Sequence, residues 1–260
     1  MFKRSHNSAL SLSLLVALYF SSASVIQADT ISIRSDVWFP MNGQPGSDQP
    51  GYMIELAQEI FSQSGHTIDY RLMPWERALS EVRKGAIDCV VGAYKEDAPD
   101  FIFPEEHWGM DNSAFYVNKG NSWRYQGLTS LNGVKLGVIG GYAYGDEFDK
   151  YVADNTSGNI QTVKGDNALE KNIKKVMAGR LDALIDSPLV VSAKLKEMGM
   201  EGKIEEAGAL GDPSPMYIAC SPAKPKTKGH IQLINEGTQA LRASGRLSEI
   251  MAKYGLKDWK

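Results

Sequence analysis

Short apolar runs alternate with segments of helical periodicity along the first half of the chain. Three β-prone runs lie at Ile31–Ile33, Thr67–Met73 and Ala86–Gly92. Between them, residues 53–61 and 74–84 carry apolar side chains three and four positions apart, and a glycine follows shortly after each segment. This spacing predicts two amphipathic helices. Strands separated by helices indicate a parallel sheet with helices on its faces.

The same pattern starts again in the second half of the chain. The expected elements are strands at 134–139, 160–163 and 181–185, helices ending near 154, 179 and 199, and terminal helices at 228–244 and 246–254. Two lone β-prone runs, 113–117 and 216–220, lack a crossover helix of their own. We therefore predict an α/β fold of two lobes, each a mainly parallel sheet flanked by helices, joined by two extended hinge crossings.

The first 28 residues are predicted to be a signal peptide. Lys3 and Arg4 precede an apolar run over 9–20, and a small, polar stretch follows. The run is too short for a membrane span, which takes about 20 residues. We expect an exported protein, soluble in the periplasm. Its expected division is a signal peptide at 1–28, a first lobe at 29–115, a second lobe at 116–215, and at 216–260 a hinge return with C-terminal helices on the first lobe.

The charge balance and the missing motifs narrow the function classes. The 260 residues include 28 Lys and Arg against 31 Asp and Glu, and 43% are hydrophobic. These values are ordinary for a globular protein and lack the basic excess of a chain that binds nucleic acid. There is no His-Glu-x-x-His, Cys-x-x-Cys, Gly-x-Ser-x-Gly or P-loop motif. We therefore expect no metal, no cofactor and no nucleic-acid partner.

The two cysteines, Cys89 and Cys220, leave two interpretations open. An oxidising compartment permits a disulfide between them. Both lie in apolar, strand-like runs, so two separate buried thiols are the favoured interpretation and a disulfide is the alternative.

Seven short segments with recognisable motifs follow one another along the chain: Gly51–Ala57, Gly85–Asp88, Phe101–Pro104, Leu131–Val138, Gly179–Ala183, Ala240–Leu247 and Lys253–Leu256. Together they resemble the family 3 solute-binding proteins, which deliver polar amino acids to ABC importers. Pro74–Ala78 is similar to a subgroup known only as substrate-binding proteins. The resemblance implies a periplasmic-binding-protein type II fold whose lobes close on a small-molecule ligand. It also implies a monomer whose partner is an ABC permease in the inner membrane.

The chain departs from this family at a position that matters for the ligand. In the amino-acid binders, an Arg shortly after the Ile-Asp strand holds the α-carboxylate of the ligand. The corresponding stretch here, Gly92–Asp100, contains Lys95 but no Arg. Either Lys95 or Arg77 takes the place of that Arg, or the ligand is not a standard α-amino acid.

The position of the crevice in open α/β sheets selects candidate ligand contacts in the first lobe. The crevice lies beyond the carboxyl ends of the strands, where helix N-termini also point. The residues that meet this rule are Trp38, Trp75, Arg77, Tyr94 and Lys95. Arg77 is the one suited to hold a carboxylate with two hydrogen bonds.

Most of these candidates also have a purely structural interpretation. The two tryptophans suit packing within the lobe, Arg77 suits an ion pair with Glu81 four residues on, and Lys95 suits a solvated turn. The resemblance adds Trp108, which lies about where relatives carry a ligand-facing Tyr near the hinge.

In the second lobe, a glycine-rich turn and an acid follow the ends of two strands. The turn at 140–145 lacks the Gly-x-Gly-x-x-Gly spacing of a dinucleotide site. Its backbone from Gly141 onward predicts a cradle for a small anion, flanked by Tyr142 or Tyr144. Asp186 suits a ligand ammonium or, alternatively, the N-cap of the next helix, and Ser187 competes with it for the ligand.

Aromatic walls, a cation and an acid predict a cleft for a small zwitterion or amino-acid-like carboxylate. We expect reversible binding by lobe closure, without catalysis, for delivery to an ABC importer. An enzyme on the same fold, similar to cyclohexadienyl dehydratases and using Glu105 or Glu106 as an acid, is one alternative. A ligand-sensing subunit for a receptor is the other.

Overall fold

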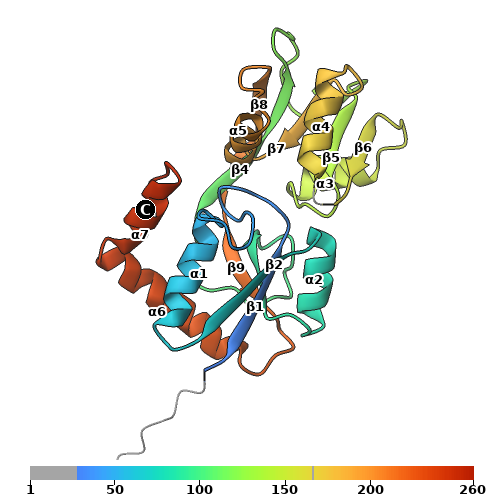
Figure 1. Ribbon diagram of the computed structural model, residues 1–260. Coiled ribbons are helices and arrows are strands. Elements are labelled where there is room, and N and C mark those ends of the chain that lie inside the picture. Colours follow the sequence, from blue (N-terminus) through green and yellow to red (C-terminus); the bar gives the residue numbers. More distant parts are fainter. Residues whose placement is uncertain (1–27, 166) are drawn as a thin grey trace, which may run out of the picture.

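The computed structural model describes residues 28–165 and 167–260, so the predicted signal peptide lies outside the described residues except for Ala28. The chain forms two lobes joined by a narrow pair of crossings (Figure 1). Within the described part of the chain, no helix combines the length and the apolar character that a membrane crossing needs.

The first lobe is built on a four-stranded sheet with the order β2-β1-β3-β9. β1 is parallel to β2 and β3, and β9 is antiparallel to β3. Its strands are β1 (Thr30–Ser35), β2 (Thr67–Leu72), β3 (Cys89–Ala93) and β9 (Tyr217–Cys220). Its helices are α1 (Tyr52–Ser62), α2 (Trp75–Arg83), α6 (Thr227–Ala243) and α7 (Arg246–Lys253).

The helices of the first lobe cover both faces of this sheet. Side chains of β3 alternate between the faces, because successive residues of a strand point to opposite sides. Cys89 and Val91 belong to the core formed with α1, α6 and α7, whereas Val90 belongs to the core formed with α2. The terminal helices therefore return to the first lobe, where they pack against α1 (Figure 1).

The second lobe is built on a five-stranded sheet with the order β6-β5-β7-β4-β8. β5 is parallel to β6 and β7, whereas β4 is antiparallel to both of its neighbours, β7 and β8. Its strands are β4 (Met110–Asn118), β5 (Leu136–Ile139), β6 (Ile160–Val163), β7 (Ala183–Asp186) and β8 (Ile204–Pro215). Its helices are η1 (Leu128–Leu131), α3 (Asp146–Ala153), α4 (Ala168–Met177) and α5 (Pro188–Glu197).

The predicted α/β fold of two lobes is confirmed, and both sheets are mixed. Crossover helices link the parallel strands of each sheet, as expected. β8 was not predicted, because its sequence is rich in Gly and Pro; it lies at the sheet edge, where Pro is tolerated. β4 begins at Met110, so the second sheet starts before the expected boundary at residue 115.

The two crossings between the lobes are hydrogen-bonded to each other. Trp108 N–H donates to Met216 O at 2.7 Å, and Met216 N–H donates to Gly109 O at 2.9 Å. A Cβ on Gly109 would lie 2.6 Å from the Met216 side chain and from Tyr52 Oη. Only glycine therefore lets the crossings approach this closely. Trp108 is fully buried and donates from Nε1 to Thr238 of α6 at 2.8 Å, which fixes the hinge to the first lobe.

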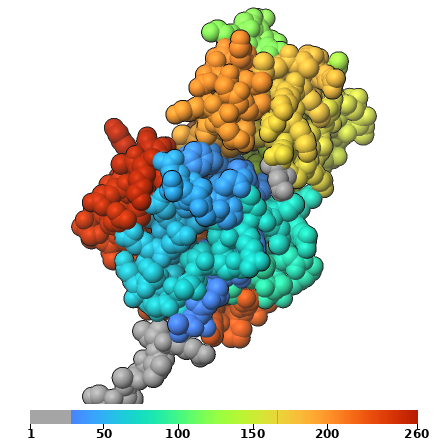
Figure 2. Space-filling view, viewed as in Figure 1, coloured from blue at the N-terminus to red at the C-terminus, as the bar shows by residue number. Residues whose placement is uncertain are grey.

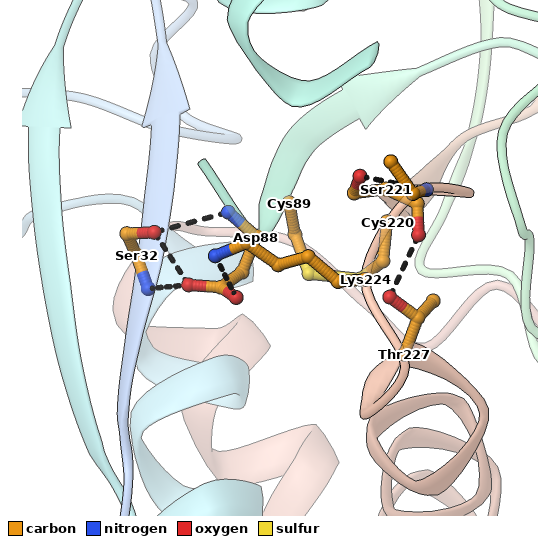
Figure 3. Close-up of a disulfide and its surroundings, with 8 residues drawn as sticks. Ser32, Asp88, Cys89, Cys220, Ser221, Lys224 and Thr227 are labelled. Carbon is orange, nitrogen blue, oxygen red and sulfur yellow. Dashed lines mark hydrogen bonds and ion pairs between the residues drawn. A yellow bond between two sulfur atoms is a disulfide. The ribbon is translucent and has the colours of Figure 1, made fainter. Parts of the chain in front are cut away.

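Cys89 and Cys220 form a disulfide (Figure 3). They lie directly opposite each other on the antiparallel strands β3 and β9. The interpretation favoured from the sequence, two separate thiols, is therefore wrong. The sequence could not reveal the pairing, because it depends on the register of two strands that are far apart in the chain.

Candidate functional site

A small cavity lies where the two lobes meet, beyond the carboxyl ends of the parallel strands. Residues that follow β1, β3, β5 and β7 all contribute to its lining, in agreement with the rule for open α/β sheets. The centre of a water molecule can occupy a volume of about 30 Å³ within the cavity. This is enough space for one or two waters. Its lining is Ser35, Asp36, Trp38, Trp75, Val91, Gly92, Tyr94, Asp97, Ser113, Tyr142, Ala143, Tyr144, Asp186 and Ser187.

Direct hydrogen bonds cross this cavity from one lobe to the other. Tyr142 Oη donates to Asp36 Oδ2 at 2.9 Å, and Trp38 Nε1 donates to Asp186 Oδ1 at 3.4 Å. Outside the cavity, Lys164 Nζ lies 2.8 Å from a carboxylate oxygen of Glu76. In the space-filling view, the yellow and orange surface of the second lobe meets the blue and cyan surface of the first (Figure 2). The lobes are therefore closed on each other.

Asp97 is the carboxylate that ties the first lobe to the glycine-rich turn of the second. Its Oδ2 accepts from Tyr94 N at 2.8 Å, and its Oδ1 accepts from Trp75 Nε1 at 3.4 Å and from Ala143 N at 3.2 Å. Burial outweighs these hydrogen bonds and raises the pKa of Asp97 to about 7.

Asp186 ends β7 and is 2% exposed. Its Oδ1 accepts from Ser187 N at 2.7 Å in addition to Trp38. Its Oδ2 is buried and has no hydrogen-bond partner among the described residues. Burial raises the pKa of Asp186 to about 7, and the nearby Asp111 and Asp36 act in the same direction.

A further carboxylate, Asp111 of β4, lies behind the lining. Its oxygens accept from Ser187 Oγ at 2.8 Å and from Tyr94 Oη at 2.9 Å. Burial raises the pKa of Asp111 to about 6. Asp97, Asp111 and Asp186 thus lie in one region, and none of the three forms a salt bridge with a basic side chain of the described residues.

The amides of the glycine-rich turn already hold carboxylates of the protein itself. Ala143 N–H binds Asp97, and Tyr144 N–H donates to Asp149 at 3.1 Å. In the closed arrangement the turn thus binds two carboxylates of the protein, and a cradle for an anion of the ligand stays a prediction. Tyr144 also accepts from Ile139 N at 2.8 Å through its hydroxyl, which holds the turn against β5.

Six of the residues selected from the sequence line the cavity together: Trp38, Trp75, Tyr94, Tyr142, Tyr144 and Asp186. Gly141 lies at the junction of the lobes just outside it. Gly141 has a φ of 86°, and a Cβ there would lie 2.3 Å from Glu76 Cγ. Glycine at this position therefore permits the turn to approach α2.

The two selected cations lie away from the cavity lining. Arg77 is exposed on α2, and Glu81, its expected ion-pair partner, instead lies 3.4 Å from Lys84 Nζ. Lys95 is exposed, with its ammonium 5.3 Å from the centre of the Tyr217 ring. Trp108 is enclosed at the hinge, as described above. Whether any of these residues contacts the ligand stays a prediction.

Sequence reasoning missed Asp36, Asp97 and Ser113 of the lining. Asp36 could have been found, because it directly follows β1 and meets the same rule that selected Trp38. Asp97 lies in the stretch that was searched for an Arg. The enzyme alternative named Glu105 and Glu106. Neither lines the cavity, and a hydrogen bond from Lys260 lowers the pKa of Glu106.

The site shows no arrangement suited to a metal ion. In residues 28–165 and 167–260, no three His, Cys, Asp or Glu side chains are placed to hold one.

Comparisons with known proteins agree with the two-lobed architecture. The chain is 22% identical over 228 residues to the probable amino-acid-binding protein YxeM of Bacillus subtilis, covering 85% of this chain and 81% of that protein. A histidine kinase sensor domain with similarity to periplasmic binding proteins superposes with a TM-score of 0.72 at 19% identity, over 88% of this chain and 98% of that one.

A substrate-binding protein of an ABC uptake transporter from Streptococcus pneumoniae, solved with bound histidine, gives a TM-score of 0.72 at 18% identity. The match covers 86% of this chain and 92% of that one. At such identities these structures establish the fold alone. The sequence profile of the bacterial extracellular solute-binding proteins, family 3, matches residues 32–257. The chain therefore belongs to the bacterial extracellular solute-binding proteins, family 3.

Proposed function

We propose that the protein binds a small polar solute of amino-acid size between its lobes in the periplasm, without altering it, and delivers it to an ABC importer. The observation that carries this proposal is the cavity between the lobes, lined by strand ends of both and crossed by direct hydrogen bonds. A cavity with room for one or two waters admits a solute only if the lobes move apart, so binding and lobe motion are coupled.

The relatives support the same class of ligand. The similar Bacillus subtilis protein is named a probable amino-acid-binding protein, and the similar Streptococcus pneumoniae protein holds histidine. These likenesses favour a solute of amino-acid size and a partnership with an importer. They do not carry over the identity of the solute.

The tryptophans of the cavity supply a direct test. Trp38 and Trp75 line it, whereas Trp123 lies in the second lobe against Phe115, away from the lining. Titration of amino acids, small carboxylates and amines is expected to change the intrinsic fluorescence for at least one compound. Trp123→Phe should keep this change, and Trp38→Phe combined with Trp75→Phe should remove it.

Two results would contradict the proposal. An affinity, measured by calorimetry, that is unchanged in Trp38→Phe combined with Trp75→Phe places binding elsewhere, whereas a residual fluorescence change does not, because Trp108 at the hinge reports lobe motion. Conversion of the bound compound, followed by mass spectrometry during incubation with purified protein, indicates an enzyme. For the delivery step, cells lacking this protein are expected to lose uptake of the solute that binds.

A further inference from the structure

The lining of the interlobe cavity carries charge of one sign. Asp36, Asp97 and Asp186 line it, and none of its described lining residues is Lys, Arg or His. Two basic side chains around this lining already have acidic partners. Lys164 binds Glu76 outside the lining. Lys194 lines the adjoining cavity together with Asp36 and Asp186, and it binds Glu197 at 2.6 Å. A solute that enters this site therefore meets Asp97 and Asp186, and no described lining residue offers a cation to a carboxylate of the solute.

Backbone amides do not make up for the missing cations. The turn that could cradle an anion already binds Asp97 and Asp149 through Ala143 and Tyr144. An incoming carboxylate would have to displace a carboxylate of the protein, and it would lose its hydration beside Asp36 and Asp186. Burying an anion without a partner is costly.

Aromatic side chains form the remaining walls of the cavity: Trp38, Trp75, Tyr94, Tyr142 and Tyr144. The Trp38 and Tyr94 rings meet edge to face with centres 6.2 Å apart, and Tyr142 and Tyr144 are tilted with centres 6.2 Å apart. Several aromatic faces around one small space attract a cation through their quadrupoles, as in sites for ammonium ligands.

Asp186 provides an acceptor that the protein itself leaves unused. Its side chain lines both this cavity and the adjoining one, and it is 2% exposed. Oδ1 has two donors, but Oδ2 is buried without a partner in the part of the chain that the structure describes. A buried acceptor without a donor costs free energy that an N–H group of a solute would recover.

We propose that the solute is an organic amine bound as a cation, with its ammonium held by Asp186 Oδ2 among the aromatic rings, and that recognition needs no carboxylate on the solute. This inference rests on the proposed function and narrows its ligand class. It also accounts for the absent family Arg, because a solute that needs no carboxylate for recognition does not need an Arg to hold one. Burial raises the pKa of Asp186 and Asp97 to about 7. A bound ammonium would supply the opposite charge that keeps them ionised.

Pairs of compounds that differ only in a carboxylate test this inference. Lysine is compared with cadaverine and arginine with agmatine, and glutarate serves as a dicarboxylate of similar length. Dissociation constants are measured by calorimetry at about pH 8, where Asp186 is ionised. At least one amine should bind about tenfold or more tightly than its matched amino acid, and glutarate should not bind.

Two variants distinguish the effect of the Asp186 side chain on binding from the effect of the negative charge of the lobe as a whole. Asp186→Asn keeps the shape but removes the charge, and it should weaken binding of that amine by about 30-fold or more. Glu201→Gln removes one negative charge from an exposed turn of the same lobe, and it should change the affinity by less than about twofold. The comparison of matched compounds needs no variant, so it stands even if Asp186→Asn fails to fold.

The outcomes distinguish this inference from the proposed function. If lysine or arginine binds as tightly as its amine and changes the fluorescence of Trp38 and Trp75, the inference falls and the proposed function stands. If neither amine binds, the inference falls as well. If an amine binds with an affinity that the loss of both tryptophans leaves unchanged, binding lies outside the cavity and both fall.

Discussion

Asp88 is half-buried and Asp186 is buried, each beside a strand, yet their surroundings are opposite. Asp88 precedes β3 at the base of the first lobe. It accepts from Lys224 Nζ at 2.5 Å and from Ser32 N at 2.8 Å (Figure 3). Burial acts to raise the pKa of Asp88, but these hydrogen bonds outweigh it and hold the pKa below its usual value. Asp186 has no such cation, and its pKa is raised to about 7.

The difference separates the base of the first lobe, which holds the fold, from the cleft, where we propose that the solute binds. At the base, the charge is matched within the protein, and the Cys89–Cys220 disulfide joins the adjoining strands. In the cleft, the buried Oδ2 of Asp186 has no protein partner among the described residues. Groups held in an unfavourable environment at a site reduce stability, and this is the usual relation between stability and activity.

Removal of the disulfide is expected to give the largest effect and to act only on stability. The bond closes a loop of 131 positions, and loss of such a bond typically costs about 2–5 kcal/mol of unfolding free energy. Cys89→Ala combined with Cys220→Ala should lower that free energy in urea denaturation, while the folded protein keeps its ligand affinity. An unchanged unfolding free energy would mean that the disulfide does not stabilise the base of the first lobe.

Substitution of the two aspartates should change stability in opposite directions. Folded Asp186 holds its proton up to about pH 7, whereas the unfolded residue releases it near pH 4. The wild-type protein therefore loses stability at this residue as the pH rises from about 4 to 7. Asp186→Asn does not titrate, so it should raise the unfolding free energy by about 1–3 kcal/mol at pH 8 and by little at pH 5.

Asp88→Asn is the matched control for this prediction. The pKa of Asp88 is lowered, so its contribution is present above the unfolded pKa and is lost only as the pH falls through the folded one. This variant should lose about 1–3 kcal/mol at pH 5 and pH 8 alike. Thermal unfolding of both variants at both pH values makes the comparison. A destabilised Asp186→Asn at pH 8 would contradict the assignment of Asp186 as an unneutralised site residue.

Most of the fold could be predicted because its signals are local. Apolar periodicity, Pro74 at a helix start and glycines after helices predicted the helices and the parallel strands. The signals failed where pairing across the sheet decides the structure. β8 contains Gly208, Gly211 and Pro213, which argue against a strand, but β4 alongside it supplies its partner.

Part of the cavity lining could be predicted from the sequence. Five aromatic residues that were selected from the sequence, and Asp186, line the cavity, because the strand-end rule depends only on topology. The rule could not reveal that Asp97 of the first lobe accepts a hydrogen bond from the backbone amide of Ala143 in the second lobe. That contact exists only once the lobes are closed, and no local pattern encodes it. The search for a cation also directed attention to Arg77 and Lys95 and away from Asp36.

The smallest expected effect concerns Arg77, and it decides between two accounts of the ligand. If a carboxylate is gripped by this Arg, Arg77→Ala abolishes binding, because a charged hydrogen bond contributes about 1.5–3 kcal/mol. The structure leaves Arg77 exposed and outside the cavity lining, so we expect its loss to change ligand affinity and stability by less than about 0.5 kcal/mol. Arg180→Ala, an exposed Arg of the second lobe, is the matched control. A large loss of affinity in Arg77→Ala alone would mean that the lobes rearrange to bring this side chain to the ligand, and an amine would then be the wrong class of solute.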